Sequence, residues 1–144
     1  MTYRFAFIAP LAAVALASCS AANVDSTPAP LTVKQSERLD KALAGKVAGK
    51  PQTCLTDGAR LNMERISDDI LLYRAGRGLV YKTQLDYACR GLGDEDDIMV
   101  IRTFAGNYCK GDTFQMVDRF SNIPGPICRF GAFVPYRKAD TNGG

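Results

Sequence analysis

Histidine and tryptophan are both absent from the 144-residue chain. Without histidine, the Ser-His-Asp and Cys-His catalytic arrangements, histidine metal sites and a histidine pH switch are excluded. Without tryptophan, the chain lacks the residue that most often stacks against sugar rings in carbohydrate-binding sites. A hydrolase that uses two carboxylates about 5 to 10 Å apart remains the alternative. We therefore expect a protein that is not an enzyme, with no catalytic residues and no cofactor.

A strong excess of one charge is also lacking, since 18 basic side chains stand against 15 acidic ones. A nucleic-acid partner would call for a strongly basic face, so we expect none. The basic residues of the expected strands suggest instead a stripe for an anionic glycolipid or lipid headgroup. Ordinary solubility is the simpler interpretation of these residues, which are Arg60, Arg65, Arg74, Arg77, Lys82 and Arg102.

Closely spaced cysteine pairs are missing, which argues against a zinc ribbon. The four cysteines of the body, Cys54, Cys89, Cys109 and Cys128, lie 19 or more positions apart. An even number of cysteines in a small exported domain indicates a disulfide framework of two bridges. The acidic run "GDEDD", residues 93–97, lacks the spacing of a calcium loop. We therefore expect no metal site.

The apolar run at the N-terminus is too short to span a bilayer, which needs about 20 residues. Arg4 precedes an uncharged apolar stretch, "FAFIAPLAAVALAS", at residues 5–18. A basic residue followed by a short apolar region is typical of a secretory signal peptide. Residues 1–18 are therefore predicted to be a signal peptide.

The end of this segment, Leu16-Ala17-Ser18-Cys19, resembles the lipobox of bacterial lipoproteins. The resemblance implies a diacylglycerol thioether on Cys19 and an amide-linked chain such as palmitate. More than one acyl chain gives stable membrane anchoring. The expected location is the bacterial cell envelope, facing the periplasm and anchored to the outer membrane. Ordinary secretion, with cleavage after Ala21 or Ala22, is the alternative.

Residues 19–32, rich in Ser, Ala, Thr and Pro, are predicted to form the lipidated cysteine and a flexible tether. Thr32 and Gln35 fit a capping box. Apolar positions at helical spacing follow, which predicts a short amphipathic helix over 33–45 with Leu39 and Leu43 packed on the domain. Gly45 is a natural helix stop.

Residues 50–137 are predicted to form the β-domain, an all-β barrel or sandwich of about six antiparallel strands. Turn residues separate the runs "ARLNMERI", "ILLYRA", "LVYKTQL", "IMVIRTF", "DTFQMVD" and "CRFGAFVPY". A two-residue turn at Gly76 would place Ile70, Leu72 and Tyr81 on one face and Leu71, Tyr73 and Val80 on the other. Either the helix or a partner must cover the second apolar face. Residues 138–144 are expected to be a disordered tail.

Strand direction predicts the disulfide pairing, because a bridge requires Cα atoms within about 7 Å. In a simple up-and-down meander, Cys54 and Cys109 fall at one end of the strands and Cys89 and Cys128 at the other. The predicted bridges are therefore Cys54–Cys109 and Cys89–Cys128. The main alternative joins sequence neighbours, Cys54 to Cys89 and Cys109 to Cys128.

Five segments together resemble a group of small exported four-cysteine proteins and lipoproteins of alphaproteobacteria and related bacteria. They are "LDKALAGKVAGKPQTCL", "SDDILLYRAGRGLVYKTQL", "IMVIRTF", "YCKGD" and "CRFGAFVPY". The resemblance implies export and a β-rich body, and no particular activity. We expect a membrane-anchored envelope lipoprotein that serves as a non-catalytic binding or structural module, with an envelope protein as a further expected partner. An inhibitor of a secreted or host enzyme, like the small barrel lipoproteins that block lysozymes, is the alternative.

Overall fold

The computed structural model describes residues 27–139, apart from residues 77, 104 and 105. The predicted signal peptide, the lipidation site at Cys19 and most of the tether lie outside the described residues, as do Arg77 and most of the predicted tail. Within the described part, no helix is long and apolar enough to cross a membrane.

The single α-helix of the described residues, α1 (Val33–Leu43), begins with the predicted capping box. The Thr32 hydroxyl accepts a hydrogen bond from the Gln35 backbone N–H at 3.3 Å, and the Gln35 side-chain oxygen accepts one from the Thr32 N–H at 2.9 Å. These bonds satisfy two N–H groups that a helix end otherwise leaves unpaired. Gly45, at φ 66°, follows the helix, which ends two residues before the predicted boundary.

The described chain contains ten strands in three antiparallel sheets, which confirms an all-β fold with one helix. The sheets are arranged as a sandwich and do not close into a barrel. The strands are β1 (Lys46–Ala48), β2 (Cys54–Leu55), β3 (Asn62–Arg65), β4 (Ile70–Arg74), β5 (Val80–Gln84), β6 (Ile98–Ile101), β7 (Tyr108–Cys109), β8 (Thr113–Val117), β9 (Pro124–Arg129) and β10 (Phe133–Lys138). A 3-10 turn, η1 (Gly58–Arg60), precedes β3.

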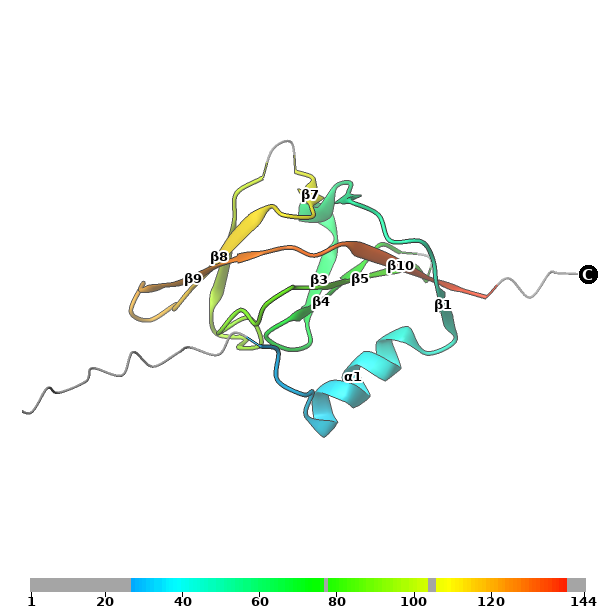
Figure 1. Cartoon of the computed structure of the whole chain (residues 1–144), viewed down its shortest axis with the longest axis horizontal. Helices are drawn as coiled ribbons and strands as arrows, with labels where there is room; N and C mark the ends of the chain where they lie inside the picture. Colours follow the sequence, from blue (N-terminus) through cyan, green and yellow to red (C-terminus); the bar gives the residue numbers. More distant parts are fainter. Residues whose placement is uncertain (1–26, 77, 104–105, 140–144) are drawn as a thin grey trace, which may run out of the picture.

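The largest sheet has the order β1-β10-β5-β4-β3, and α1 covers one of its faces (Figure 1). Leu39 and Leu43 of the helix pack against a buried cluster that joins Ala42 of the helix to residues of the sheet: Ile66, Ile70, Leu72 and Val80. Burying this apolar surface is the main favourable contribution to docking the helix. The helix therefore covers the face of the β4–β5 hairpin that carries Ile70 and Leu72.

The other face of the large sheet forms the main core with two smaller sheets, β6-β8-β9 and β2-β7. Aromatic rings fill this core: Phe130 lies 4.7 Å from Phe114, 5.4 Å from Tyr108 and 5.9 Å from Phe133, centroid to centroid. Such offset and tilted ring pairs contribute beyond their buried area. The core thus joins residues from all three sheets.

The β4–β5 hairpin departs from the predicted register by one residue. Arg74 pairs with Val80 and Tyr73 with Tyr81, so a two-residue turn at Gly76 is wrong. Ala75 and Leu79 extend the ladder through a hydrogen bond of 3.0 Å and leave three residues in the loop. Because a slip of one residue reverses every side chain, Tyr81 joins Leu71 and Tyr73 in the main core, whereas Val80 faces the helix.

The last predicted strand is two strands in different sheets. β9 begins at Pro124, inside a stretch expected to be a turn, and β10 follows after Gly131. β9 is an edge strand, and only an edge tolerates the missing N–H groups of its two prolines. β10 includes Lys138, the first residue of the predicted tail. The short strands β1, β2 and β7 were not predicted.

Candidate functional site

The four cysteines of the body form the predicted bridges. Cys54 and Cys109 are bonded with their Cα atoms 4.0 Å apart, and Cys89 and Cys128 with theirs 5.7 Å apart. The simple meander behind the prediction is wrong, however, because β5 pairs with β10 and not with β6, which lies in a different sheet. Cys54 and Cys109 meet as directly opposed residues of the β2-β7 ladder. The first bridge joins the two strands of one sheet, and the second joins the loop after β5 to β9.

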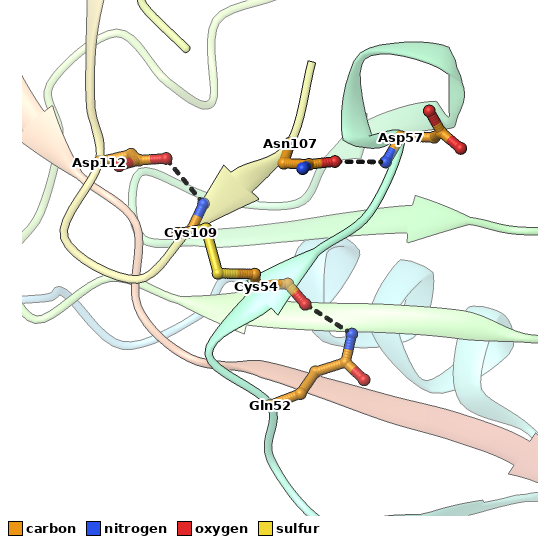
Figure 2. The surroundings of a disulfide bond; sticks show 6 residues. All are labelled: Gln52, Cys54, Asp57, Asn107, Cys109 and Asp112. Carbon is orange, nitrogen blue, oxygen red and sulfur yellow. Dashed lines mark hydrogen bonds between the residues drawn. A yellow bond between two sulfur atoms is a disulfide. The ribbon is translucent and has the colours of Figure 1, made fainter. Parts of the chain in front are cut away.

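Hydrogen bonds between side chains and backbone groups surround the Cys54–Cys109 bridge (Figure 2). The Cys109 N–H donates to Asp112 Oδ2 at 2.8 Å, and Gln52 Nε2 donates to the Cys54 carbonyl at 2.9 Å. The Asp57 N–H donates to Asn107 Oδ1 at 3.2 Å across the same two strands. These contacts fix the two short strands that carry the bridge.

The acidic run at residues 93–97 binds an arginine through its backbone. Arg65 Nη1 donates to the Asp94 carbonyl at 2.7 Å and to the Asp97 carbonyl at 2.9 Å. The Asp68 carboxylate accepts from the Gly93 N–H at 2.9 Å. In the part of the chain that the structure describes, no three Cys, Asp or Glu residues are grouped as metal ligands would be.

The described basic residues that were considered for a stripe do not share one face of the fold. Arg65 shares the core side of the sheet with Leu71, whereas Arg74 shares the helix side with Val80. Arg74 also pairs with Glu64, at 2.6 Å between Nη2 and Oε2. Arg102 follows β6 in a different sheet. The strand alternation thus divides these cations among several faces.

The loop between β8 and β9, residues 118–123, carries two exposed apolar side chains. The Asp118 carboxylate accepts hydrogen bonds from the backbone N–H groups of Phe120 at 2.9 Å and Ser121 at 2.7 Å. Across the loop, the Asp118 N–H donates to the Ile123 carbonyl at 3.1 Å, and the Asn122 N–H to the Asp118 carbonyl at 2.9 Å. These bonds give the loop a fixed conformation.

Hydrogen bonds from Ser121 and Phe120 lower the pKa of the Asp118 carboxyl below its ordinary value of 3.8. A carboxylate that accepts backbone N–H bonds is favoured in its charged form. The ionised carboxylate is therefore the form that accepts these hydrogen bonds in the loop.

The loop exposes two large apolar side chains, Phe120 at 82% and Ile123 at 65%. Figure 1 shows this segment, in orange, extending to the left beyond the strands of the two layers. Both side chains lie in a turn whose own hydrogen bonds use only backbone and polar groups. We call residues 118–123 the hairpin loop.

More apolar residues continue along the side of the β6-β8-β9 sheet that faces away from the core, which we call the outer face. Val100, Gln115 and Ile127 are neighbours across the three strands, and Ile127 is 70% exposed. Tyr87 and Ile127 line a hollow of about 290 Å³. α1 covers the large sheet, and no described element packs on this face.

Comparisons with protein-family models, with curated proteins and with solved structures find no match. The sequence alone does not reveal the hairpin loop and the outer face, because residues 119–126 appear in it only as turn residues between two expected strands. The available signal was the placement of Phe120 and Ile123, two large apolar residues, within a polar turn. The number of cysteines indicated two bridges, and strand direction gave their pairing.

Proposed function

We propose that this chain is a non-catalytic binding module of the bacterial envelope, anchored by lipid on Cys19, whose hairpin loop and outer face hold a protein partner. The presentation of Phe120 on a loop with a fixed conformation carries the proposal. Aromatic residues are enriched among the side chains that dominate binding energy. A preorganised loop also loses little conformational entropy on binding.

The composition of the surface supports a protein partner. Phe120, Tyr87 and Ile127 are exposed apolar anchors, and Arg129 beside Ile127 and Arg119 in the hairpin loop are exposed cations. Interfaces are enriched in aromatic residues and arginine and depleted in acidic residues. Scattered exposed apolar residues are common on any protein, but a contiguous group of them indicates a binding surface.

The anchor rests on the sequence "LASC" at residues 16–19, which resembles a lipobox. A tether of about 13 residues reaches at most about 45 Å when extended and averages about 20 Å as a flexible coil. The domain would therefore stay near the membrane surface, facing the periplasm on the outer membrane. Its partner is accordingly an envelope protein within that distance.

The projecting shape of the hairpin loop favours one second candidate, an inhibitor of a secreted or host enzyme. A narrow loop that ends in an exposed aromatic side chain can enter a concave active site. Lysozyme is the first enzyme to assay, with cell-wall hydrolysis as the readout. Inhibition that the Phe120→Ser variant loses would favour the inhibitor over an envelope-binding role.

Affinity capture from detergent-solubilised envelope tests the main proposal. The full chain, a Phe120→Ser variant and a Val33→Ser variant serve as bait in parallel. Val33 is 76% exposed on α1, so its replacement removes a comparable apolar side chain far from the hairpin loop. We expect one protein that the wild type and Val33→Ser retain and that Phe120→Ser loses. Equal capture by all three baits would contradict the proposal.

A further inference from the structure

The two larger sheets of the described chain have four edge strands, which are β1, β3, β6 and β9. An edge strand leaves a row of backbone N–H and C=O groups without a ladder partner, and proteins block such edges with proline, charged side chains or very short strands. Pro124 and Pro126 block β9 in this way. β3 contains Glu64 and Arg65, and β1 is a three-residue strand that begins with Lys46.

β6 differs from the other edges, because its four residues, Ile98–Ile101, include neither a proline nor a charged side chain. It pairs with β8 on one side. On the other side, a hollow of about 390 Å³ lies between β6 and β3, which belongs to a different sheet. Ile98 and Val100 are 43% and 44% exposed. β6 is therefore an open apolar edge that another strand can extend.

The sequence around β6 is complementary to itself in the antiparallel direction. From residue 96 to residue 102, exposed and half-buried side chains alternate, and Asp96, Ile98, Val100 and Arg102 are the exposed ones. Directly opposed residues of an antiparallel ladder lie on the same face of the sheet. A two-fold axis through Met99 would place Ile98 opposite Val100 of a second copy. The same axis would place Asp96 opposite Arg102 of that copy.

The two charged residues are free to make this contact. Neither Asp96 nor Arg102 has an ion-pair partner among the described residues. Opposite charges at directly opposed positions of a ladder are favourable, and like charges are unfavourable. Because a two-fold axis repeats every contact, the pairing contains two such ion pairs, one at each end of the ladder. Self-complementary interfaces of this kind form two-fold dimers, the commonest oligomers of soluble proteins.

We propose that β6 pairs with β6 of a second copy of this chain, in the antiparallel direction, with Met99 on the two-fold axis and an ion pair between Asp96 and Arg102 at each end. The two β6-β8-β9 sheets would join into one sheet of six strands, with the outer faces of the two copies side by side. The partner proposed for the hairpin loop has no part in this pairing, so the dimer does not depend on the proposed function.

Sedimentation equilibrium of the full chain, in a detergent whose density the solvent matches, measures the dimer. We expect the wild type to form a dimer at about 0.1 mM chain. Arg102→Asp and Asp96→Arg each place like charges opposite one another at both ends of the ladder. Each variant should weaken the dimer at least about tenfold. Arg129→Asp makes the same charge change at an exposed residue of β9, and this control should leave the dimer unchanged.

A mixture of the two variants tests the register. A heterodimer of an Asp96→Arg chain with an Arg102→Asp chain restores opposite charges at both ends of the ladder. We therefore expect the mixture to dimerise about as tightly as the wild type, although each variant alone does not.

Amide hydrogen exchange followed by NMR locates the interface without any variant. Every second amide of β6 should become protected as the concentration of the wild-type chain rises, and the amides of β1 should not. A wild-type chain that stays monomeric at about 0.1 mM would overturn the proposal. A dimer that leaves the β6 amides unprotected, or a mixture of the two variants that dimerises no better than either variant alone, would overturn it as well.

Discussion

Replacing Thr83 by valine should stabilise the protein, although it removes a polar group from the centre of a sheet. Thr83 lies on β5 between Leu71 and Phe133, is 0% exposed, and its hydroxyl has no hydrogen-bond partner. Burying a hydroxyl without a partner costs about 1 to 3 kcal/mol in protein mutational data. Valine has nearly the same shape and avoids this cost.

We expect Thr83→Val to raise the free energy of unfolding by about 1 kcal/mol, the lower end of that range. For a domain of about 100 residues, this change corresponds to an increase in Tm of about 5 °C. Thermal unfolding of the full chain followed by circular dichroism, with both disulfides intact, measures the shift.

Thr83→Ser is the control, because it keeps the hydroxyl and removes the methyl group. Loss of one buried methyl group should lower the free energy of unfolding by about 1 kcal/mol, so the two variants shift Tm in opposite directions. A Thr83→Val variant that is less stable than the wild type would show that the hydroxyl has a partner. That result would refute the reasoning about unpaired groups in this core.

Three further predictions follow from single residues. In Gly131→Ala, the added methyl group would overlap the carbonyl oxygen of Gln84. We therefore expect urea unfolding to show a free energy of unfolding that is lower by about 3 kcal/mol. An unchanged urea midpoint would contradict the close packing at Gly131. The hydrogen bonds to Asp118 lower its pKa. Their contribution to the stability of the fold is therefore fully present above pH 3.8 and is lost as the pH falls through the lowered pKa. The amide NMR signal of Phe120 should therefore titrate with a midpoint below 3.8, and a midpoint above this value would argue against the fixed loop. Mass spectrometry of the mature N-terminal peptide should find an acylated Cys19, whereas an unmodified peptide that begins at residue 22 or 23 would contradict the lipobox.

The helix was predictable because its signals are local. The capping box joins residues three apart, and Gly45 supplies the left-handed residue at the end. Neither signal depends on the rest of the fold.

The strands of the β4–β5 hairpin were equally predictable from the sequence, but their register depended on one residue in the loop. Gly76 and Gly78 both have positive φ, and the resulting three-residue loop reverses the faces of Tyr81 and Val80.

Non-local structure was harder to predict. β2 and β7 contain two residues each, and they pair over a separation of 55 positions. No periodicity can be detected in two residues. The prolines of β9 indicated a turn, because the edge position that makes them acceptable is a property of the sheet.

The candidate site was predictable only in part. The pairing of Cys54 with Cys109 followed from strand direction, although these residues are opposed within a ladder rather than adjacent to strand ends. The exposure of Phe120 depends on the hairpin projecting from the fold. This is a property of the packing of the layers, which the local sequence does not contain.

Photocrosslinking at the hairpin loop in living cells tests the proposed binding role most directly. A photoreactive phenylalanine analogue replaces Phe120 in the full chain, and the same analogue at exposed Val33 on α1 is the control. The account predicts that irradiation yields one discrete envelope protein crosslinked from position 120 and no equivalent product from position 33. The same product from both positions, or no product from position 120, would contradict the hairpin loop as the binding element.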